Sequence, residues 1–221
     1  MAAHRGWLYD RFVAGMTSGW YREVLTRLPH GTRLLDVGVG TGAALVRCAD
    51  LIRERELSVV GIDVDADYLA RCERAVQRAG LAPRVLPRLQ SVYDHSGGPY
   101  DAAYFSASLM LLPDPAAAVR RVAGLLRPGG TLYATQTFQL RRSRLVERGK
   151  PLVRYVTTIE FGRVTYEDEF RSCLAAAGVE LTGLHTMAAT RHHAYRLAIA
   201  RPVPRPSPSV EPVVERVSDT A

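Results

Sequence analysis

The chain has 221 residues, of which 47% are hydrophobic, and it carries a formal net charge of +7. This length is enough for one domain that buries most of its apolar surface, and it excludes a second domain of full size. Lys150 is the single lysine among the 29 basic residues, so the positive charge consists almost wholly of arginine spread along the chain. We interpret this charge as a compositional bias rather than a nucleic-acid-binding stripe, because no long block of basic residues is present.

The cysteines and the hydropathy pattern indicate a cellular location. Cys48, Cys72 and Cys173 lie far apart among apolar neighbours, and their odd number argues for buried free thiols in a reducing compartment. The N-terminus lacks the apolar run of a secretory signal, and no run approaches the length of a membrane span. We therefore predict a soluble, cytoplasmic protein.

Residues 1–30 are predicted to form an N-terminal helical cap. Aromatic residues alternate with charged ones in this segment, and apolar residues recur at helical spacing between Tyr21 and Leu28. Two interpretations stay open for the aromatic side chains: they anchor the helix to the core, or they line a binding site.

A glycine-rich turn follows a predicted buried strand. Leu34–Val37 is an apolar run, and Gly38, Gly40 and Gly42 then alternate with other residues before an apolar helix start. Glycines allow a sharp turn and leave no Cβ between the main chain and a ligand, while free N–H groups at the helix start face that ligand. We therefore expect a ligand at this turn. Its G-x-G-x-G spacing differs from the G-x-G-x-x-G dinucleotide fingerprint, and Asp36 lies two residues before the first glycine.

Helices and strands are predicted to alternate after this turn. We expect helices over 43–56 and 67–79, with Gly80 ending the second one. Between them, Val59–Asp63 has the composition of a second buried strand that ends in a carboxylate. In a doubly wound sheet, the Asp63 carboxylate at this position accepts hydrogen bonds from ribose hydroxyls.

The remaining elements complete an α/β pattern. A third strand is expected within Leu81–Leu89, and Pro83 and Pro87 indicate that it is short or lies toward an edge. The elements expected after it are a fourth strand over 102–105, a helix over 116–126 capped by Asp114, a fifth strand over 131–138, a lid-like insertion over 141–162, a helix over 166–177 capped by Thr165, strands over 179–187 and 193–200, and a disordered Pro-rich tail over 202–221.

Four segments in this order resemble the class I S-adenosylmethionine-dependent methyltransferases. They are Asp36-x-Gly38-x-Gly40-x-Gly42, Val59–Asp63, Tyr100–Phe105 and Leu125–Leu132. The resemblance implies one α/β domain over 31–201, built on a doubly wound, seven-stranded, mostly parallel sheet with an antiparallel last strand, the Rossmann-like methyltransferase fold. It also implies S-adenosyl-L-methionine as the cofactor and methyl transfer as the reaction.

The resemblance assigns a set of cofactor-binding residues. The backbone at Gly38, Gly40 and Gly42 is expected to approach the cofactor. Asp63 is expected to hold the ribose, and Asp36 to orient the glycine loop or meet the amino-acid moiety through water.

The adenine is assigned to the loop after the third strand. Ser91 stands where the family commonly has an acidic residue, so its hydroxyl is expected to meet the adenine amino group while the N–H of Val92 donates to the ring. Asp94 is an alternative acceptor for that amino group.

The acceptor side is less defined. Candidate acceptor-site residues are Tyr9, Tyr21, Ser106 and His192. A hydroxyl acceptor needs a general base, for which His192 or His193 is the first candidate, whereas an amine or thiol acceptor needs little beyond positioning. No catalytic residue is assigned, and no cluster with metal-ligand spacing is present.

The leading hypothesis is methyl transfer to a small-molecule or lipid-head-group acceptor by in-line displacement. Nucleic acid is not the expected partner, because the chain lacks the Asp/Asn-Pro-Pro-aromatic string that enzymes acting on base amino groups typically carry after the fourth strand. Peripheral contact with a membrane remains compatible with the sequence, which carries no signal for an oligomeric state. The alternatives are an RNA or protein methyltransferase, a dinucleotide-dependent oxidoreductase, and an S-adenosylmethionine-binding protein without turnover.

Overall fold

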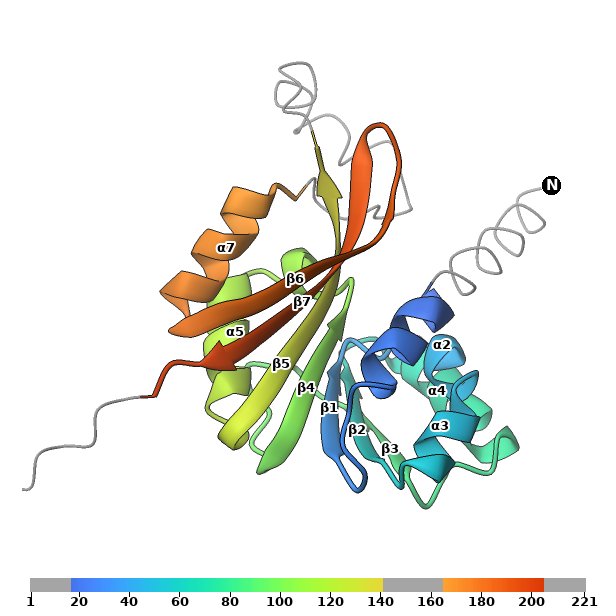
Figure 1. The fold of residues 1–221 in the computed structure, drawn as a ribbon. Helices are drawn as coiled ribbons and strands as arrows, with labels where there is room; N and C mark the ends of the chain where they lie inside the picture. The colour runs from blue at the N-terminus through green and yellow to red at the C-terminus, as the bar shows by residue number, and fades with distance from the viewer. Residues whose placement is uncertain (1–16, 141–164, 205–221) are drawn as a thin grey trace, which may run out of the picture.

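The computed structural model describes residues 17–140 and 165–204 (Figure 1). The predictions for Tyr9, for the lid-like insertion over 141–162 and for the tail beyond residue 204 fall outside these described residues, as does the first part of the N-terminal cap.

A seven-stranded sheet forms the centre of the domain, with the strand order β3-β2-β1-β4-β5-β7-β6. Strands β1 to β5 pair in parallel, and β7 pairs antiparallel with β5 on one side and with β6 on the other. The predicted sheet with an antiparallel last strand is therefore confirmed. The strand bounds are β1 Arg33–Val37, β2 Ser58–Asp63, β3 Val85–Leu89, β4 Tyr100–Ser106, β5 Leu126–Gln139, β6 Val179–Ala189 and β7 His193–Pro202.

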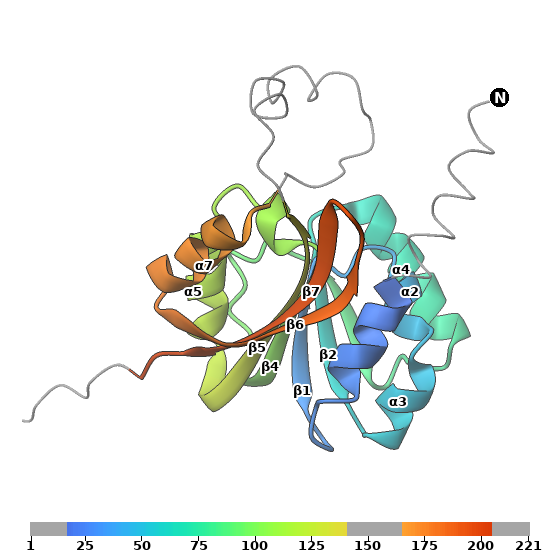
Figure 2. The same cartoon turned by 45° about the horizontal axis from the view of Figure 1, so that its top comes forward.

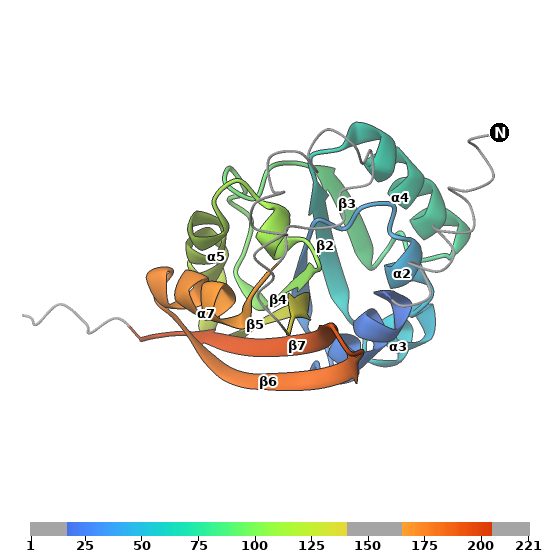
Figure 3. The same cartoon turned by 90° about the horizontal axis from the view of Figure 1, so that it is seen from above.

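Helices cover both faces of the sheet (Figures 1 and 3). The N-terminal helix, α2, α3 and α4 lie on one face, and α5 and α7 lie on the other. Because the central strands are covered on both sides, β1 and β4 are apolar along most of their length, as expected for parallel strands. The helix bounds are residues 17–25 for the N-terminal helix, α2 Ala43–Val46, α3 Ala49–Glu54, α4 Ala66–Arg78, the short 3-10 helix Leu109–Leu111, α5 Pro115–Ala123 and α7 Glu167–Ala176.

Several predicted details hold. The proline-containing strand β3 is five residues long and lies at an edge of the sheet. Asp114 caps α5 by accepting a hydrogen bond from the Ala117 N–H (2.9 Å). Gly80 and Gly178 follow α4 and α7 with φ angles of 63° and 72°, which glycine adopts at low cost.

Two predicted helix bounds were wrong. The single helix expected over 43–56 is divided into α2 and α3, and the break falls at Cys48, whose Sγ contacts the Ser18 carbonyl of the N-terminal helix (3.7 Å). The helix expected to run to residue 126 ends at Ala123, because Leu126 already pairs with Tyr100 as the start of β5.

The predicted cap at Thr165 was also wrong. Tyr166 occupies the N-cap position of α7, without a side-chain capping bond. Thr165 instead forms a parallel bridge with Phe138, and its hydroxyl accepts a hydrogen bond from Gln136 Nε2 (3.2 Å). The end of β5 therefore fixes Thr165 before the helix begins.

Candidate functional site

The glycine turn joins β1 to α2 at the carboxyl edge of the parallel strands. Gly38, Gly40 and Gly42 have φ angles of 79°, 56° and 65°, a left-handed region that other residues adopt at a cost of about 1–2 kcal/mol. A Cβ on Gly42 would lie 2.5 Å from Cys72 Sγ, so this glycine is required for packing. A Cβ on Gly40 would meet nothing within 4 Å, so the space beside this residue is open to a ligand.

Asp63, the last residue of β2, fastens the glycine turn. Its Oδ2 accepts a hydrogen bond from the Gly40 N–H (2.8 Å), and its Oδ1 accepts one from the Asp65 N–H (2.9 Å). Each carboxylate oxygen has a further lone pair, so Asp63 retains the capacity to accept from two hydroxyl groups.

Asp36 lies buried in β1, two residues before the turn. Its side chain is 0% exposed, and its Oδ2 accepts a hydrogen bond from the Tyr21 hydroxyl (2.8 Å). Oδ1 has no hydrogen-bond partner among the described residues. Burial raises the pKa of Asp36 from its ordinary 3.8 to about 7, the bond from Tyr21 opposes this rise, and the negative charge of Asp63 adds to it.

Ser108, two residues beyond the end of β4, supports the turn and was not among the predicted site residues. Its hydroxyl donates to the Val37 carbonyl (2.5 Å), and a Cβ on Gly38 would lie 2.8 Å from its Cβ. The preceding Ala107 has a φ of 56°, so the chain turns sharply here to bring Ser108 against the glycines. A left-handed alanine gives no sequence signal.

The predicted adenine loop begins beside Asp63. The Gln90 N–H donates to the Asp63 carbonyl (2.8 Å), which brings the ribose and adenine candidates together. The Ser91 hydroxyl accepts from the Tyr93 N–H (3.3 Å). Val92 is buried in the core, so only its backbone remains for a ligand, and Asp94 is exposed.

The acceptor-site candidates do not come together. Tyr21 is buried, and its hydroxyl is bound to Asp36. Ser106 is half-buried at the end of β4 opposite Thr135, whereas His192 is exposed in the turn between β6 and β7. Ser106 pairs with Thr135 of β5, and His193 pairs with Gln139, four residues further along the same strand. About 13 Å of strand therefore separates the levels of Ser106 and His193. In Figure 1 the hairpin of β6 and β7 extends, together with the end of β5, beyond β1 and β4, and in Figure 2 the hairpin lies in front of the central strands.

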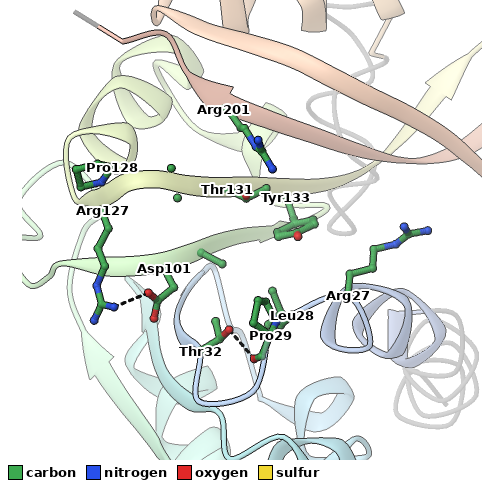
Figure 4. A pocket seen from close by; sticks show the side chains of 13 residues that line it. Arg27, Leu28, Pro29, Thr32, Asp101, Arg127, Pro128, Thr131, Tyr133 and Arg201 are labelled. Atoms are coloured by element: carbon green, nitrogen blue, oxygen red, sulfur yellow. Dashed lines mark hydrogen bonds and ion pairs between the residues drawn. The ribbon is translucent and has the colours of Figure 1, made fainter.

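A cavity of about 390 Å³ lies at the opposite edge of the sheet (Figure 4). Residues at the starts of β4 and β5 and at the end of β7 line it. Three arginines, Arg27, Arg127 and Arg201, surround it. Arg127 is ion-paired with Asp101 (2.7 Å). Since ligands of open α/β sheets bind at the carboxyl ends of the strands, this cavity is separate from the candidate site.

Residues 17–140 and 165–204 offer neither a metal site nor a membrane-spanning helix. This part of the chain contains no group of three or more His, Cys, Asp or Glu side chains arranged to hold a metal. It also contains no helix long and apolar enough to cross a membrane.

Comparison with known proteins gives consistent matches. A family model described as a methyltransferase domain matches residues 35–132. A ubiquinone biosynthesis O-methyltransferase from Xylella fastidiosa (strain M23) is 30% identical over 198 residues, which cover 80% of this chain and 77% of that protein. A phosphatidylethanolamine N-methyltransferase from Cereibacter sphaeroides is 28% identical over 132 residues, covering 59% of this chain and 63% of that protein.

The name of a further relative gives tRNA as its substrate. A tRNA 5-carboxymethoxyuridine methyltransferase from Escherichia coli (strain K12) is 28% identical over 137 residues, covering 56% of this chain and 51% of that protein. The match therefore spans less than two thirds of this relative and of the phosphatidylethanolamine N-methyltransferase.

Solved structures share the fold. The cyclase SpnF has a TM-score of 0.69 at 20% identity, over 84% of this chain and 81% of that chain. A geranyl diphosphate methyltransferase in complex with S-adenosylmethionine has a TM-score of 0.66 at 15% identity, over 84% of this chain and 85% of that chain. At these identities the likeness concerns the fold.

Proposed function

This chain belongs to the class I S-adenosylmethionine-dependent methyltransferases, and from that premise we propose that it transfers a methyl group to a small-molecule or lipid-head-group acceptor. The observation that supports this most directly is the pairing of Gly40 with Asp63. The glycine leaves open space at a left-handed turn, and the carboxylate that fastens this turn retains acceptor capacity.

The chain's own residues fit S-adenosylmethionine. Gly38, Gly40 and Gly42 would hold it through their backbone, and Asp63 would accept hydrogen bonds from the ribose. The residues assigned to the adenine are Ser91 and Val92. Asp36 presents a buried oxygen that has no hydrogen-bond partner among the described residues, which suits a polar or cationic group at the methionine end.

Positioning carries most of the proposed catalysis. The cofactor supplies an activated methyl group on a sulfonium, which an acceptor atom displaces in line. Holding the two reacting atoms in place contributes about 7–11 kcal/mol to lowering the barrier. We therefore assign no catalytic base, and we propose Ser106 as an acceptor-side residue because it ends β4 at the carboxyl edge.

The acceptor class rests on the relatives. Two of the three bear names with a quinone-pathway or phospholipid acceptor, and we propose a similar acceptor here. An RNA acceptor is the second candidate, favoured by the tRNA methyltransferase match. A cytoplasmic location is proposed with this function, supported by the three free cysteines.

Two experiments test this function. Calorimetric titration with S-adenosylmethionine, S-adenosylhomocysteine and NADH should give binding of the first two alone, and binding of NADH alone would refute the proposal. Labelled S-adenosylmethionine should then be incubated separately with a metabolite extract, phospholipid vesicles and total tRNA. Labelled methyl groups in a small molecule or lipid would support the proposed acceptor class. Labelled methyl groups in tRNA would instead identify RNA as the acceptor.

A further inference from the structure

The connection between β3 and β4 differs from the other parallel crossovers. Residues 90–99 carry the chain from the carboxyl end of β3 to the start of β4 without a helix, whereas α2 to α5 cover the other crossovers among β1 to β5. Loop 90–94, called the adenine loop below, therefore has no helix within its own crossover to support it, and contacts with neighbouring residues hold it in place.

His95 supplies such contacts from a buried position. The residue is 1% exposed, its Nδ1 lies 2.7 Å from Gln90 Oε1, and its Nε2 lies 2.8 Å from the Tyr100 hydroxyl. The Gln90 oxygen can only accept, so Nδ1 carries the proton, and Nε2 of the neutral ring accepts from Tyr100. His95 thus links the beginning of the adenine loop to β4.

Gln90 connects His95 to residues that are assigned to cofactor binding. Its Nε2 donates to the Asp94 carbonyl (3.4 Å), which closes the loop, and its backbone N–H donates to the Asp63 carbonyl (2.8 Å). On the other side, the Tyr93 hydroxyl accepts from the Asp114 N–H (3.0 Å) and donates to the Asp114 carbonyl (3.1 Å). The loop is therefore held at both sides.

We propose that His95 is a positioning residue that holds the adenine loop in the form that accepts the cofactor, and that protonation of its ring weakens cofactor binding. This inference rests on the proposed function, because it takes loop 90–94 to be the adenine site. Within the described part of the chain, the His95 ring hydrogen-bonds to Gln90 and Tyr100, which belong neither to the glycine turn nor to the acceptor-site candidates.

The charges around His95 make its neutral form the working form. Burial lowers the pKa of His95, and Arg88 of β3, Arg121 of α5 and Arg33 of β1 lower it further. Arg121 Nε donates to the His95 carbonyl (2.8 Å), and the Arg33 guanidinium lies 4.9 Å from the centre of the Tyr100 ring. Tyr100 is the facing titratable group, and burial raises its pKa, so its hydroxyl keeps its proton.

Protonation would disturb this arrangement. A protonated ring donates from both nitrogens, so the Tyr100 hydroxyl would have to turn its own proton away from Nε2. It would also place another positive charge among three arginines in a buried site, which raises the free energy of the closed loop. The loop would then open more readily at acid pH.

The test compares variants by their affinity for S-adenosylhomocysteine between pH 5 and pH 8. His95→Leu removes both hydrogen bonds and should weaken binding about tenfold at pH 7.5. His95→Asn keeps a donor near the Nδ1 position, so it should restore most of the affinity and lose the acid-dependent part of the wild-type profile. Asp36 titrates in the wild type and in every variant, so the difference between their profiles of affinity against pH reports the contribution of His95 alone. The control is His30→Asn, an exposed histidine at the opposite edge.

Hydrogen exchange separates this inference from the proposed function. In the ligand-free protein, amides 91–94 should exchange faster in His95→Leu and in Tyr100→Phe than in the wild type. If the wild type fails to bind S-adenosylhomocysteine, the proposed function fails, and this exchange experiment still tests the restraint. Unchanged exchange in both variants, or one pH profile shared by wild type and His95→Asn, would overturn the inference.

Discussion

The Tyr21 hydroxyl donates a 2.8 Å hydrogen bond to Asp36 Oδ2 and so joins the N-terminal helix to β1 two residues before the glycine turn. The Tyr21 ring also packs edge-on against Tyr104 of β4, with 5.0 Å between ring centres. One side chain thus ties the helix to the two central strands, and it does so through a carboxyl group that is fully buried.

Stability should fall as the pH rises through the range in which Asp36 titrates. The native pKa of about 7 exceeds the ordinary 3.8, so the native state retains a proton that the unfolded chain releases between these values. Between pH 5 and pH 8 the loss should be about 2–3 kcal/mol. Asp36→Asn should remove this loss, and urea unfolding at pH 5 and pH 8 measures it. The exposed Asp67→Asn variant is the control, and parallel pH profiles for wild type and Asp36→Asn would contradict the assignment.

Tyr21→Phe should destabilise the protein more at pH 8 than at pH 5. The variant removes the donor to Asp36 and leaves a buried carboxylate short of a partner, at a cost of about 1–3 kcal/mol. At pH 5 the carboxyl group is protonated, so less is lost. Denaturation of this variant and of the exposed Tyr68→Phe control gives the comparison. Equal losses at both pH values would mean that the ring packing, rather than the hydroxyl, carries the effect.

Asp63→Ala should weaken S-adenosylmethionine binding by roughly 10- to 150-fold, the loss expected for hydrogen bonds to a charged group. The Gly40 and Asp65 N–H groups also lose their acceptor, so the melting temperature should drop as well. Asp63→Asn retains one acceptor oxygen and should lie between the wild type and the alanine variant. Calorimetry measures these affinities, and an unchanged affinity in Asp63→Ala would contradict the prediction.

Gly40→Ala and Gly31→Ala should separate backbone strain from ligand contact. Both glycines have positive φ angles, 56° and 73°, and a Cβ on either would meet nothing within 4 Å. Each variant should therefore lose about 1–2 kcal/mol of stability. Only Gly40→Ala should also lose cofactor affinity, because the added methyl group occupies the open space of the glycine turn. Equal affinities in the two variants would show that the ligand lies elsewhere.

The elements that sequence patterns predicted are those governed by burial and by local turn chemistry. Val59–Asp63 and the strand before Gly38 form buried strands because helices cover both faces, and Pro87 lies at the edge where a missing N–H is tolerated. Asp114 caps its helix through a bond three residues away, which a short motif encodes.

The features that sequence patterns missed depend on contacts between distant segments. The break at Cys48 coincides with the crossing of the N-terminal helix, and Thr165 is fixed by β5 rather than by its own helix. Ser108 reaches the glycine turn through a left-handed alanine. His95 stands in a short polar segment without periodicity, so only the fold reveals that it faces Gln90 and Tyr100.

The place of β7 inside the sheet bears on the order of events during synthesis. Strand β7 lies between β5 and β6, so β5 keeps an unpaired edge until residues 193–202 have left the ribosome. A nascent chain halted before His193 would expose the long strand β5 and leave β6 with no neighbour to join. Chaperone capture of stalled chains should therefore persist until this last strand is available, and premature termination after residue 192 should yield insoluble product rather than a shortened domain.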